Sequence, residues 1–179
     1  MEEEKDVLED EKAYEFLKKF FASHGVTLKR PSKEELKEEI ICYLRENNIL
    51  TLATCRDNMP RATVLEYRND GLTIYVGSEG GGKFANLAVN KNVSFTIASP
   101  YTTFFSCHGL QGWGRAEVYK EGTKEFDDGM KILKPERALV ELGMKDMPAV
   151  FNRRLIKIIP EKLKYGHLIK GYVNAIYVP

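Results

Sequence analysis

The chain lacks the features that mark several classes of protein. Its three cysteines, Cys42, Cys55 and Cys107, are an odd number without paired spacing, which predicts reduced thiols in or near the core. Basic and acidic residues leave a net charge of only +1, which argues against a nucleic-acid partner. No apolar run approaches the length of a membrane span, and the acidic start is unlike a signal peptide. We therefore expect a soluble, cytoplasmic protein with neither a membrane nor a nucleic acid as its partner.

The chain length of 179 residues, 43% of them hydrophobic, fits one globular domain and an N-terminal extension. Within the extension, apolar residues recur at helical spacing over residues 9–22, so one face of this helix must be buried on the main domain or on a second subunit. Gly25 suits the position just after the helix, and Pro31 then breaks the chain. We divide the chain into a helical extension, residues 1–31, and a main domain, residues 32–179.

The main domain is predicted to begin with a helix and continue with strands. Ser32 and Glu35 match a capping box, and the helix they open should end at residues 47–48. From Ile49 the apolar period changes to that of strands, interrupted by a short helix after Lys83 and by a helical segment over residues 120–142. The predicted strands are 49–55, 61–67, 72–77, 92–98, 101–117, 155–159 and 172–178.

The turn chemistry favours an antiparallel arrangement. Asp70-Gly71 is typical of a hairpin, so we expect strands 61–67 and 72–77 to pair with each other. Closely spaced hairpins with one interposed helix favour a barrel over a doubly wound sheet.

The segment Gly80-Gly81-Gly82-Lys83 lies between a predicted strand and a predicted helix. Glycines let a backbone approach a ligand closely, and the N–H groups at a helix start carry partial positive charge. With a lysine at its mouth, this segment is a candidate binding site for a phosphate group.

Several segments together resemble a known family. They are Leu50-Thr-Leu-Ala-Thr54, Met59-Pro60-Arg61, Asp70-Gly71, Tyr75-Val-Gly-Ser78, Lys83, Asn86-Leu87, Asn90 and Gly114-Arg-Ala-Glu-Val118. In this order and spacing the chain is similar to the split-barrel flavin proteins related to pyridoxamine 5′-phosphate oxidase, over roughly residues 36–160. The resemblance implies a mainly β (α+β) fold, a six-stranded antiparallel split barrel with flanking helices.

The resemblance also implies a cofactor and an assembly, namely FMN bound where the two subunits of a homodimer meet. Lys83 would pair with the FMN phosphate, Ser78 would donate a hydroxyl hydrogen bond, and Arg61 would reach the phosphate or the ribityl chain. Thr63, Val64 and Leu65 would lie along the flavin ring, and Gln111 would come from the second subunit. The implied function is that of an FMN-dependent oxidoreductase acting on a small-molecule acceptor. The cofactor would carry the redox chemistry, so no catalytic side chain and no metal is predicted.

Each site residue also has an ordinary structural interpretation. Lys83 could be a solvated lysine at a helix start, Arg61 an exposed strand residue, and Thr63 ordinary sheet filling. Cys107 and His108 are adjacent strand residues that point to opposite faces, so we predict no shared metal or nucleophilic site there. The aromatic residues Tyr101, Phe104, Phe105 and Trp113 suit either a pocket or simple packing.

Two departures from the family limit the functional prediction. Residues 164–178 lack the tryptophan and the arginine–histidine pattern that hold the substrate phosphate in the oxidases proper, so oxidation of vitamin B6 is not expected. Gly80-Gly81-Gly82 is richer in glycine than the family's usual version, in which an arginine commonly lies beside the lysine, so one charge partner of the phosphate is expected to be missing. The alternatives are a non-catalytic flavin-binding sensor or carrier, or the same scaffold holding a deazaflavin or a heme, with His108 or His167 as an axial ligand.

Overall fold

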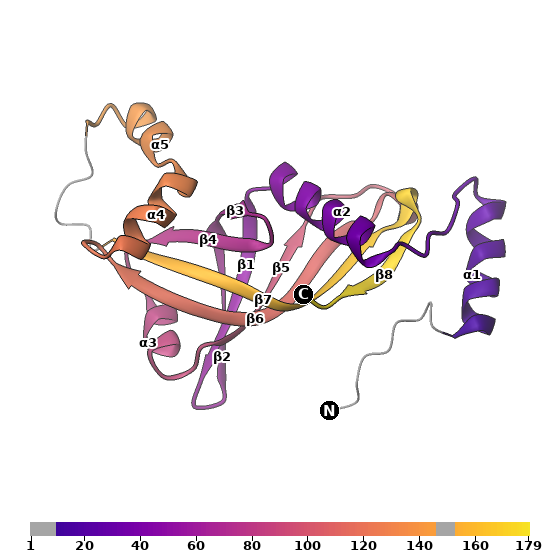
Figure 1. Ribbon diagram of the computed structural model, residues 1–179, viewed down its shortest axis with the longest axis horizontal. Coiled ribbons are helices and arrows are strands. Elements are labelled where there is room, and N and C mark those ends of the chain that lie inside the picture. The colour runs from indigo at the N-terminus through magenta and orange to yellow at the C-terminus, as the bar shows by residue number, and fades with distance from the viewer. Residues whose placement is uncertain (1–9, 146–152) are drawn as a thin grey trace.

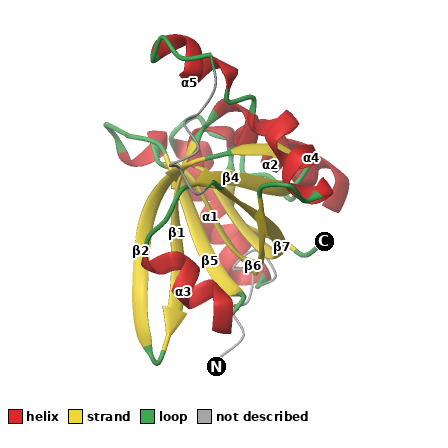
Figure 2. Ribbon diagram, turned by 90° about the vertical axis from the view of Figure 1, so that its left-hand side faces the viewer, coloured by secondary structure: helices red, strands yellow, loops and turns green. Residues whose placement is uncertain are grey.

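A single antiparallel sheet forms the body of the protein in the computed structural model, which describes residues 10–145 and 153–179. The sheet has eight strands in the order β2-β1-β5-β6-β7-β4-β3, and β8 pairs with β7 beside this path. It curls so that one face encloses the main core (Figures 1 and 2). The strands are β1 (Ile49–Arg56), β2 (Met59–Glu66), β3 (Arg68–Asp70), β4 (Thr73–Ser78), β5 (Asn92–Ala98), β6 (His108–Lys120), β7 (Arg154–His167) and β8 (Tyr172–Tyr177).

Five α-helices in the described residues surround the sheet: α1 (Glu11–Ser23), α2 (Lys33–Glu46), α3 (Gly82–Val89), α4 (Lys124–Leu133) and α5 (Glu136–Glu141). Helices α4 and α5 lie at one end of the molecule and α1 at the other, while α2 lies across the sheet (Figure 1). No helix among the described residues is long and apolar enough to cross a membrane.

The predicted antiparallel split-barrel architecture is confirmed, whereas the predicted count of six strands is wrong, since the sheet has eight. The strand that none of the predicted ranges covers is β3, a three-residue segment that pairs with β4 around Gly71. The expected pairing of strands 61–67 and 72–77 is therefore wrong. Strand β2 pairs with β1 instead, because Asp57 and Asn58 both have positive φ and form a two-residue hairpin turn.

Two strand boundaries differ from the prediction for local reasons. Residues 101–107 are not strand, because Thr103 and Ser106 cap each other in a short 3₁₀ helix, Phe104–Ser106. Strand β7 continues beyond Ile159 to His167, although Pro160 stands within it. The register with β6 shifts here: Trp113 pairs with Lys162 and Gly114 with Pro160, so β7 has one extra residue, Glu161, in a bulge, which is where a sheet tolerates a proline.

The extension helix was predicted over residues 9–22 and is observed as α1, followed by Gly25 at a φ of +75°. Phe21, Val26 and Leu28 are buried in a small cluster against side chains near the C-terminal strands, including Phe105 and Leu168. The apolar face of α1 is thus covered, at least in part, by its own chain. The division of the chain at residue 31 stays a prediction.

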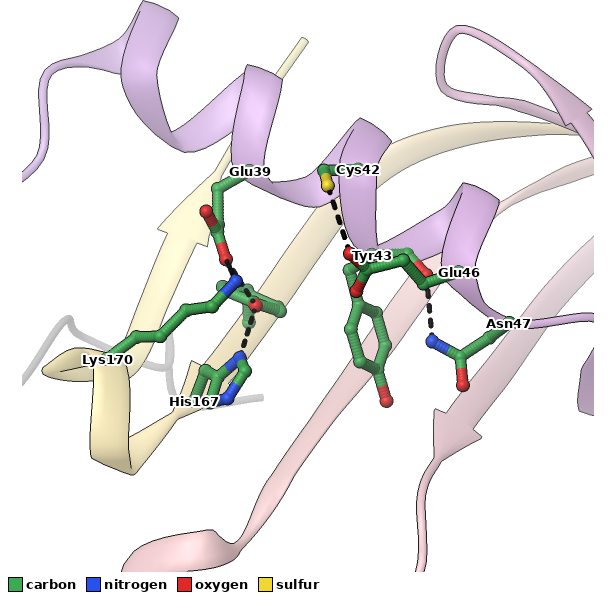
Figure 3. A network of polar contacts seen from close by, with 8 residues as sticks. Glu39, Cys42, Tyr43, Glu46, Asn47, His167 and Lys170 are labelled. Atoms are coloured by element: carbon green, nitrogen blue, oxygen red, sulfur yellow. Dashed lines mark hydrogen bonds and ion pairs between the residues drawn. The ribbon is translucent and has the colours of Figure 1, made fainter.

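Helix α2 joins the core to a polar network at its surface. The predicted capping box of Ser32 and Glu35 is confirmed, and the buried face of α2 includes Ile40 and Leu44. On the same helix, Glu39 accepts hydrogen bonds from the Tyr165 hydroxyl at 3.0 Å and from Lys170 Nζ at 2.6 Å (Figure 3). Burial opposes ionisation of Glu39, but these two hydrogen bonds outweigh it and lower the pKa of this carboxyl group.

The cysteines lie differently from the expectation. All three are free, but Cys42 is exposed on α2, and Cys55 and Cys107 are half-buried rather than part of the core. Cys42 donates a hydrogen bond to Glu46, which raises the pKa of its thiol (Figure 3).

Candidate functional site

The glycine-rich segment forms the start of α3, which packs against β1 and β2 (Figure 2). Gly81 is the N-cap residue and has a φ of +101°, a conformation that glycine adopts without strain. No side chain caps the helix, so no side-chain acceptor occupies the first N–H groups. A Cβ atom on Gly82 would lie 2.8 Å from Nε of Arg61, whereas a Cβ on Gly80 would meet nothing within 4 Å. Two of the three positions therefore require glycine: Gly81 for its positive φ, and Gly82 because Arg61 lies where a side chain would be.

Lys83 is buried, with 6% of its surface exposed. Its Nζ donates a hydrogen bond of 2.5 Å to the carbonyl oxygen of Gly80 and lies 4.9 Å from the centre of the Phe84 ring. Burial, and next the positive charge of Arg61, lower the pKa of Lys83. The lysine is thus neither a solvated surface residue nor neutralised by a described carboxylate.

Arg61 reaches this segment from β2. Its register partner is Thr54 of β1, whose side chain is buried toward α3, so Arg61 lies on the same face of the sheet as the helix. The guanidinium group then packs directly on the backbone of Gly82. Among residues 10–145 and 153–179, no carboxylate forms an ion pair with Arg61 or Lys83. Two adjacent cations without an acidic partner among the described residues have the charge that suits a bound anion.

Two buried polar contacts hold α3 in this position. Asn86 Nδ2 donates a hydrogen bond of 3.0 Å to Thr54 Oγ1, and both side chains are buried. Asn90 Nδ2 donates to the carbonyl oxygen of Cys55 at 3.2 Å. The two asparagines fix the helix start relative to β1, and with it the position of Lys83.

Ser78 is the last residue of β4 and lies opposite Arg154 in β7. The guanidinium carbon of Arg154 lies 4.7 Å from the centre of the Phe84 ring, the same ring that Lys83 approaches. Ser78 and Arg154 also line a cavity of ≈ 490 Å³, whose other walls include residues of α4 and Tyr67. The sequence analysis missed Arg154, because only the pairing of β4 with β7 brings it to this position.

Val64 and Gln111 lie on the opposite face of the sheet from Arg61. They belong to one cross-strand row, in which Val64 pairs with Thr51, Thr51 with Thr96, and Thr96 with Gln111. Val64 is 68% exposed and Gln111 is also exposed. Thr63 and Leu65 alternate with Val64 and lie opposite the buried residues Leu52 and Leu50 on the inner face. The seven predicted site residues are therefore divided between two faces of the sheet.

The sequence comparison identifies the family. The model of the pyridoxamine 5′-phosphate oxidase family matches residues 36–166. The chain belongs to this family. The match includes all seven predicted site residues as well as Arg154, and it excludes α1 and β8.

Solved structures confirm the family's fold. General stress protein 26 from Bacillus anthracis is 19% identical with a TM-score of 0.56, covering 80% of this chain and 98% of that chain. An FAD-binding protein from Mesorhizobium loti is 18% identical with a TM-score of 0.54, covering 70% and 90%. The heme storage protein HutZ from Vibrio cholerae is 20% identical with a TM-score of 0.60, covering 75% and 98%. No curated protein sequence matches the chain.

The histidines named in the sequence analysis form a stacked pair within this family fold. His108 and His167 are register partners on β6 and β7, and their rings lie 4.8 Å apart at an angle of 20°. Nδ1 of His108 is 2.7 Å from the carbonyl oxygen of Ser106, and Nδ1 of His167 is 3.0 Å from the Tyr165 hydroxyl. Burial, Lys170 and His108 lower the pKa of His167. No group of three or more metal-ligating side chains occurs among the described residues.

Proposed function

We propose that the protein is an FMN-binding flavoprotein and an oxidoreductase that transfers hydride or electrons to a small-molecule acceptor. One observation carries this proposal. Lys83, which is buried, and Arg61, which is exposed, meet at the start of α3, where Gly81 and Gly82 have no side chains and no described carboxylate neutralises the two cations. A dianionic phosphate group would supply the missing negative charge and would accept hydrogen bonds from both side chains.

The residues present fit such a cofactor. Lys83 and Arg61 would hold the phosphate group, and the hydroxyl of Ser78 would add a hydrogen bond from the end of β4. The backbone of Thr63, Val64 and Leu65 would position the flavin ring along β2, which is an edge strand of the sheet. When bound, a flavin supplies the capacity to accept and donate a hydride. The protein would contribute binding and orientation, and no side chain is assigned a catalytic role.

A second copy of the chain would complete the site. Gln111 lies three strands away from Val64, which corresponds to about 14 Å at the usual spacing of strands. A ring that lies along β2 would therefore not reach the Gln111 side chain of its own chain. The exposed row that joins Val64 to Gln111 gives a face on which a partner could pack. We propose a homodimer in which Gln111 of one chain meets the flavin held by the other.

Heme is the second candidate, because a structural neighbour is described as a heme storage protein. It would need His108 or His167 as an axial ligand. The two rings stack on each other and use their Nδ1 atoms in hydrogen bonds, which favours a structural role for the pair. The cluster of cations at α3 favours a phosphate-bearing cofactor instead.

The absorption spectrum of the purified protein distinguishes these candidates. We expect the two-banded visible absorbance of a flavin and, after release by denaturation, a cofactor with the mass of FMN. A single intense heme band, or no affinity for added FMN, would contradict the proposal. Reduction of the bound flavin by NADH or NADPH, followed by reoxidation with an added acceptor, would support an enzyme. Stable binding without reduction would indicate a carrier or sensor.

A further inference from the structure

Arg154 carries a buried polar atom that has no hydrogen-bond partner among residues 10–145 and 153–179. It is the first residue of β7, and its Nε is buried without a hydrogen-bond partner. A buried donor of this kind is costly to leave unpaired, especially on a charged group. No other side-chain nitrogen or oxygen among the described residues is buried without a partner.

The position of Arg154 connects it to the other two cations. Its guanidinium carbon lies 4.7 Å from the centre of the Phe84 ring, and Lys83 Nζ lies 4.9 Å from the same centre. Arg61 in turn contacts Gly82, the residue before Lys83. Lys83 and Arg154 thus share contact with Phe84 in the first turn of α3, and Arg61 lies beside Gly82 at the start of the same helix. Like charges repel one another, so an anion bound among the three side chains would stabilise the arrangement.

Two other arginines near Arg154 have carboxylate partners, which Arg154 lacks among the described residues. Arg153 forms an ion pair with Glu121, and Arg68 forms one with Glu66 at 2.8 Å. All three arginines line the same cavity. Within the described part of the chain, only Arg154 among them has no carboxylate partner.

We propose that Arg154 is the third cation of the phosphate site and binds the terminal phosphate of FMN together with Lys83 and Arg61. This inference rests on the proposed function. It also answers a departure noted in the sequence. The family commonly has an arginine beside the lysine, where this chain has the glycines 80–82, and Arg154 would supply a guanidinium group from β7 instead. Position 82 has to be glycine in this arrangement, because a side chain there would displace the guanidinium group of Arg61.

The same chemistry would suit an anionic substrate in the adjoining cavity, and the experiment separates the two sources. Affinities for FMN and for riboflavin, which lacks the phosphate, are measured by flavin fluorescence for the wild type, Arg154→Gln and Arg153→Gln. Arg153→Gln is the matched control, because it removes the same charge from the adjacent residue. A thermal-shift series with inorganic phosphate alone is run on the same three apo-proteins.

We expect Arg154→Gln to weaken FMN binding by about 10- to 100-fold, the range for one charge-assisted hydrogen bond to a phosphate. Riboflavin binding should change by less than about twofold, and phosphate should stabilise the wild type and Arg153→Gln but not Arg154→Gln. Arg154→Lys keeps the charge but loses the two parallel N–H donors of the guanidinium group, so its FMN affinity should lie between those of the wild type and Arg154→Gln. The ratio of the two flavin affinities does not depend on the folded fraction, so a destabilised variant still gives an answer.

Two outcomes would overturn the inference. In the first, the wild type binds FMN but Arg154→Gln keeps the wild-type ratio of FMN to riboflavin affinity, which would place the anion of Arg154 elsewhere and leave the proposed function intact. In the second, the wild type binds neither flavin, which would remove the proposed function and this inference together.

Discussion

Replacing Lys83 by methionine should separate cofactor binding from stability. Methionine keeps the length and the apolar stem of the side chain but removes the charge. Lys83 is 6% exposed, and its pKa is lowered by burial and by Arg61, so the folded protein without cofactor disfavours the charged form. The variant should therefore fold at least as well as the wild type in the absence of FMN. With FMN present it should lose the contact that the phosphate makes with the ammonium group.

The size of the binding effect follows from the contact removed. A hydrogen bond to a charged group contributes about 1.5–3 kcal/mol, which corresponds to an FMN affinity lower by about 10- to 150-fold. The substitution also affects the stability of the apo-protein. It removes the hydrogen bond from Lys83 to the carbonyl oxygen of Gly80, a contact that contributes about 1 kcal/mol. Relief of the repulsion between Lys83 and Arg61 offsets that loss, so we expect little net change in the apo melting temperature.

Isothermal titration with FMN and riboflavin gives the affinities, and differential scanning calorimetry gives the melting temperature of the apo-protein. Lys91→Met is the matched control, because Lys91 is exposed just after the same helix and should change neither quantity. The reasoning fails if Lys83→Met binds FMN as tightly as the wild type. It also fails if FMN and riboflavin binding are weakened equally, since the phosphate contact would then not be the cause.

Three further predictions follow from single contacts. Gly82→Ala should weaken FMN binding in titrations by displacing the guanidinium group beside it, whereas Gly80→Ala, with open space around its Cβ position, should bind FMN normally. The lowered pKa of His167 means that the unfolded state binds more protons, so the free energy of unfolding should fall as pH drops through the histidine range. Urea titrations from pH 8 to pH 5 should show a weaker pH dependence of the free energy of unfolding for His167→Gln than for the wild type. Asn86→Ala should cost about 1–3 kcal/mol in urea unfolding, because it leaves a buried hydroxyl unpaired; a wild-type midpoint would contradict the role given to this contact.

Local chemistry made much of this structure predictable from the sequence. The capping box at Ser32, the glycine after α1 and the helix start at Gly81–Lys83 each depend on residues close together in the chain. The strand periods placed most of β1, β2, β4 and β5 correctly for the same reason.

Contacts between distant segments account for what the sequence did not reveal. Arg154 comes to lie opposite Ser78 and near Phe84 only because β7 pairs with β4, and no local pattern encodes this pairing. Strand β7 continues through Pro160 because β7 has a bulge directly after it, at Glu161, so a rule that ends a strand at a proline stops too early. The distance from Val64 to Gln111 was not predictable from the sequence, because it depends on the order of four strands in the sheet.

The most direct test of the account is the affinity of the unmodified protein for FMN compared with riboflavin, measured by titration under the same conditions. The two ligands share the ring and the ribityl chain and differ only in the phosphate group. Three cations around the start of α3 predict that FMN binds more tightly than riboflavin by at least about 100-fold. Equal affinities, or no binding of either flavin, would contradict the assignment of this site to the cofactor phosphate.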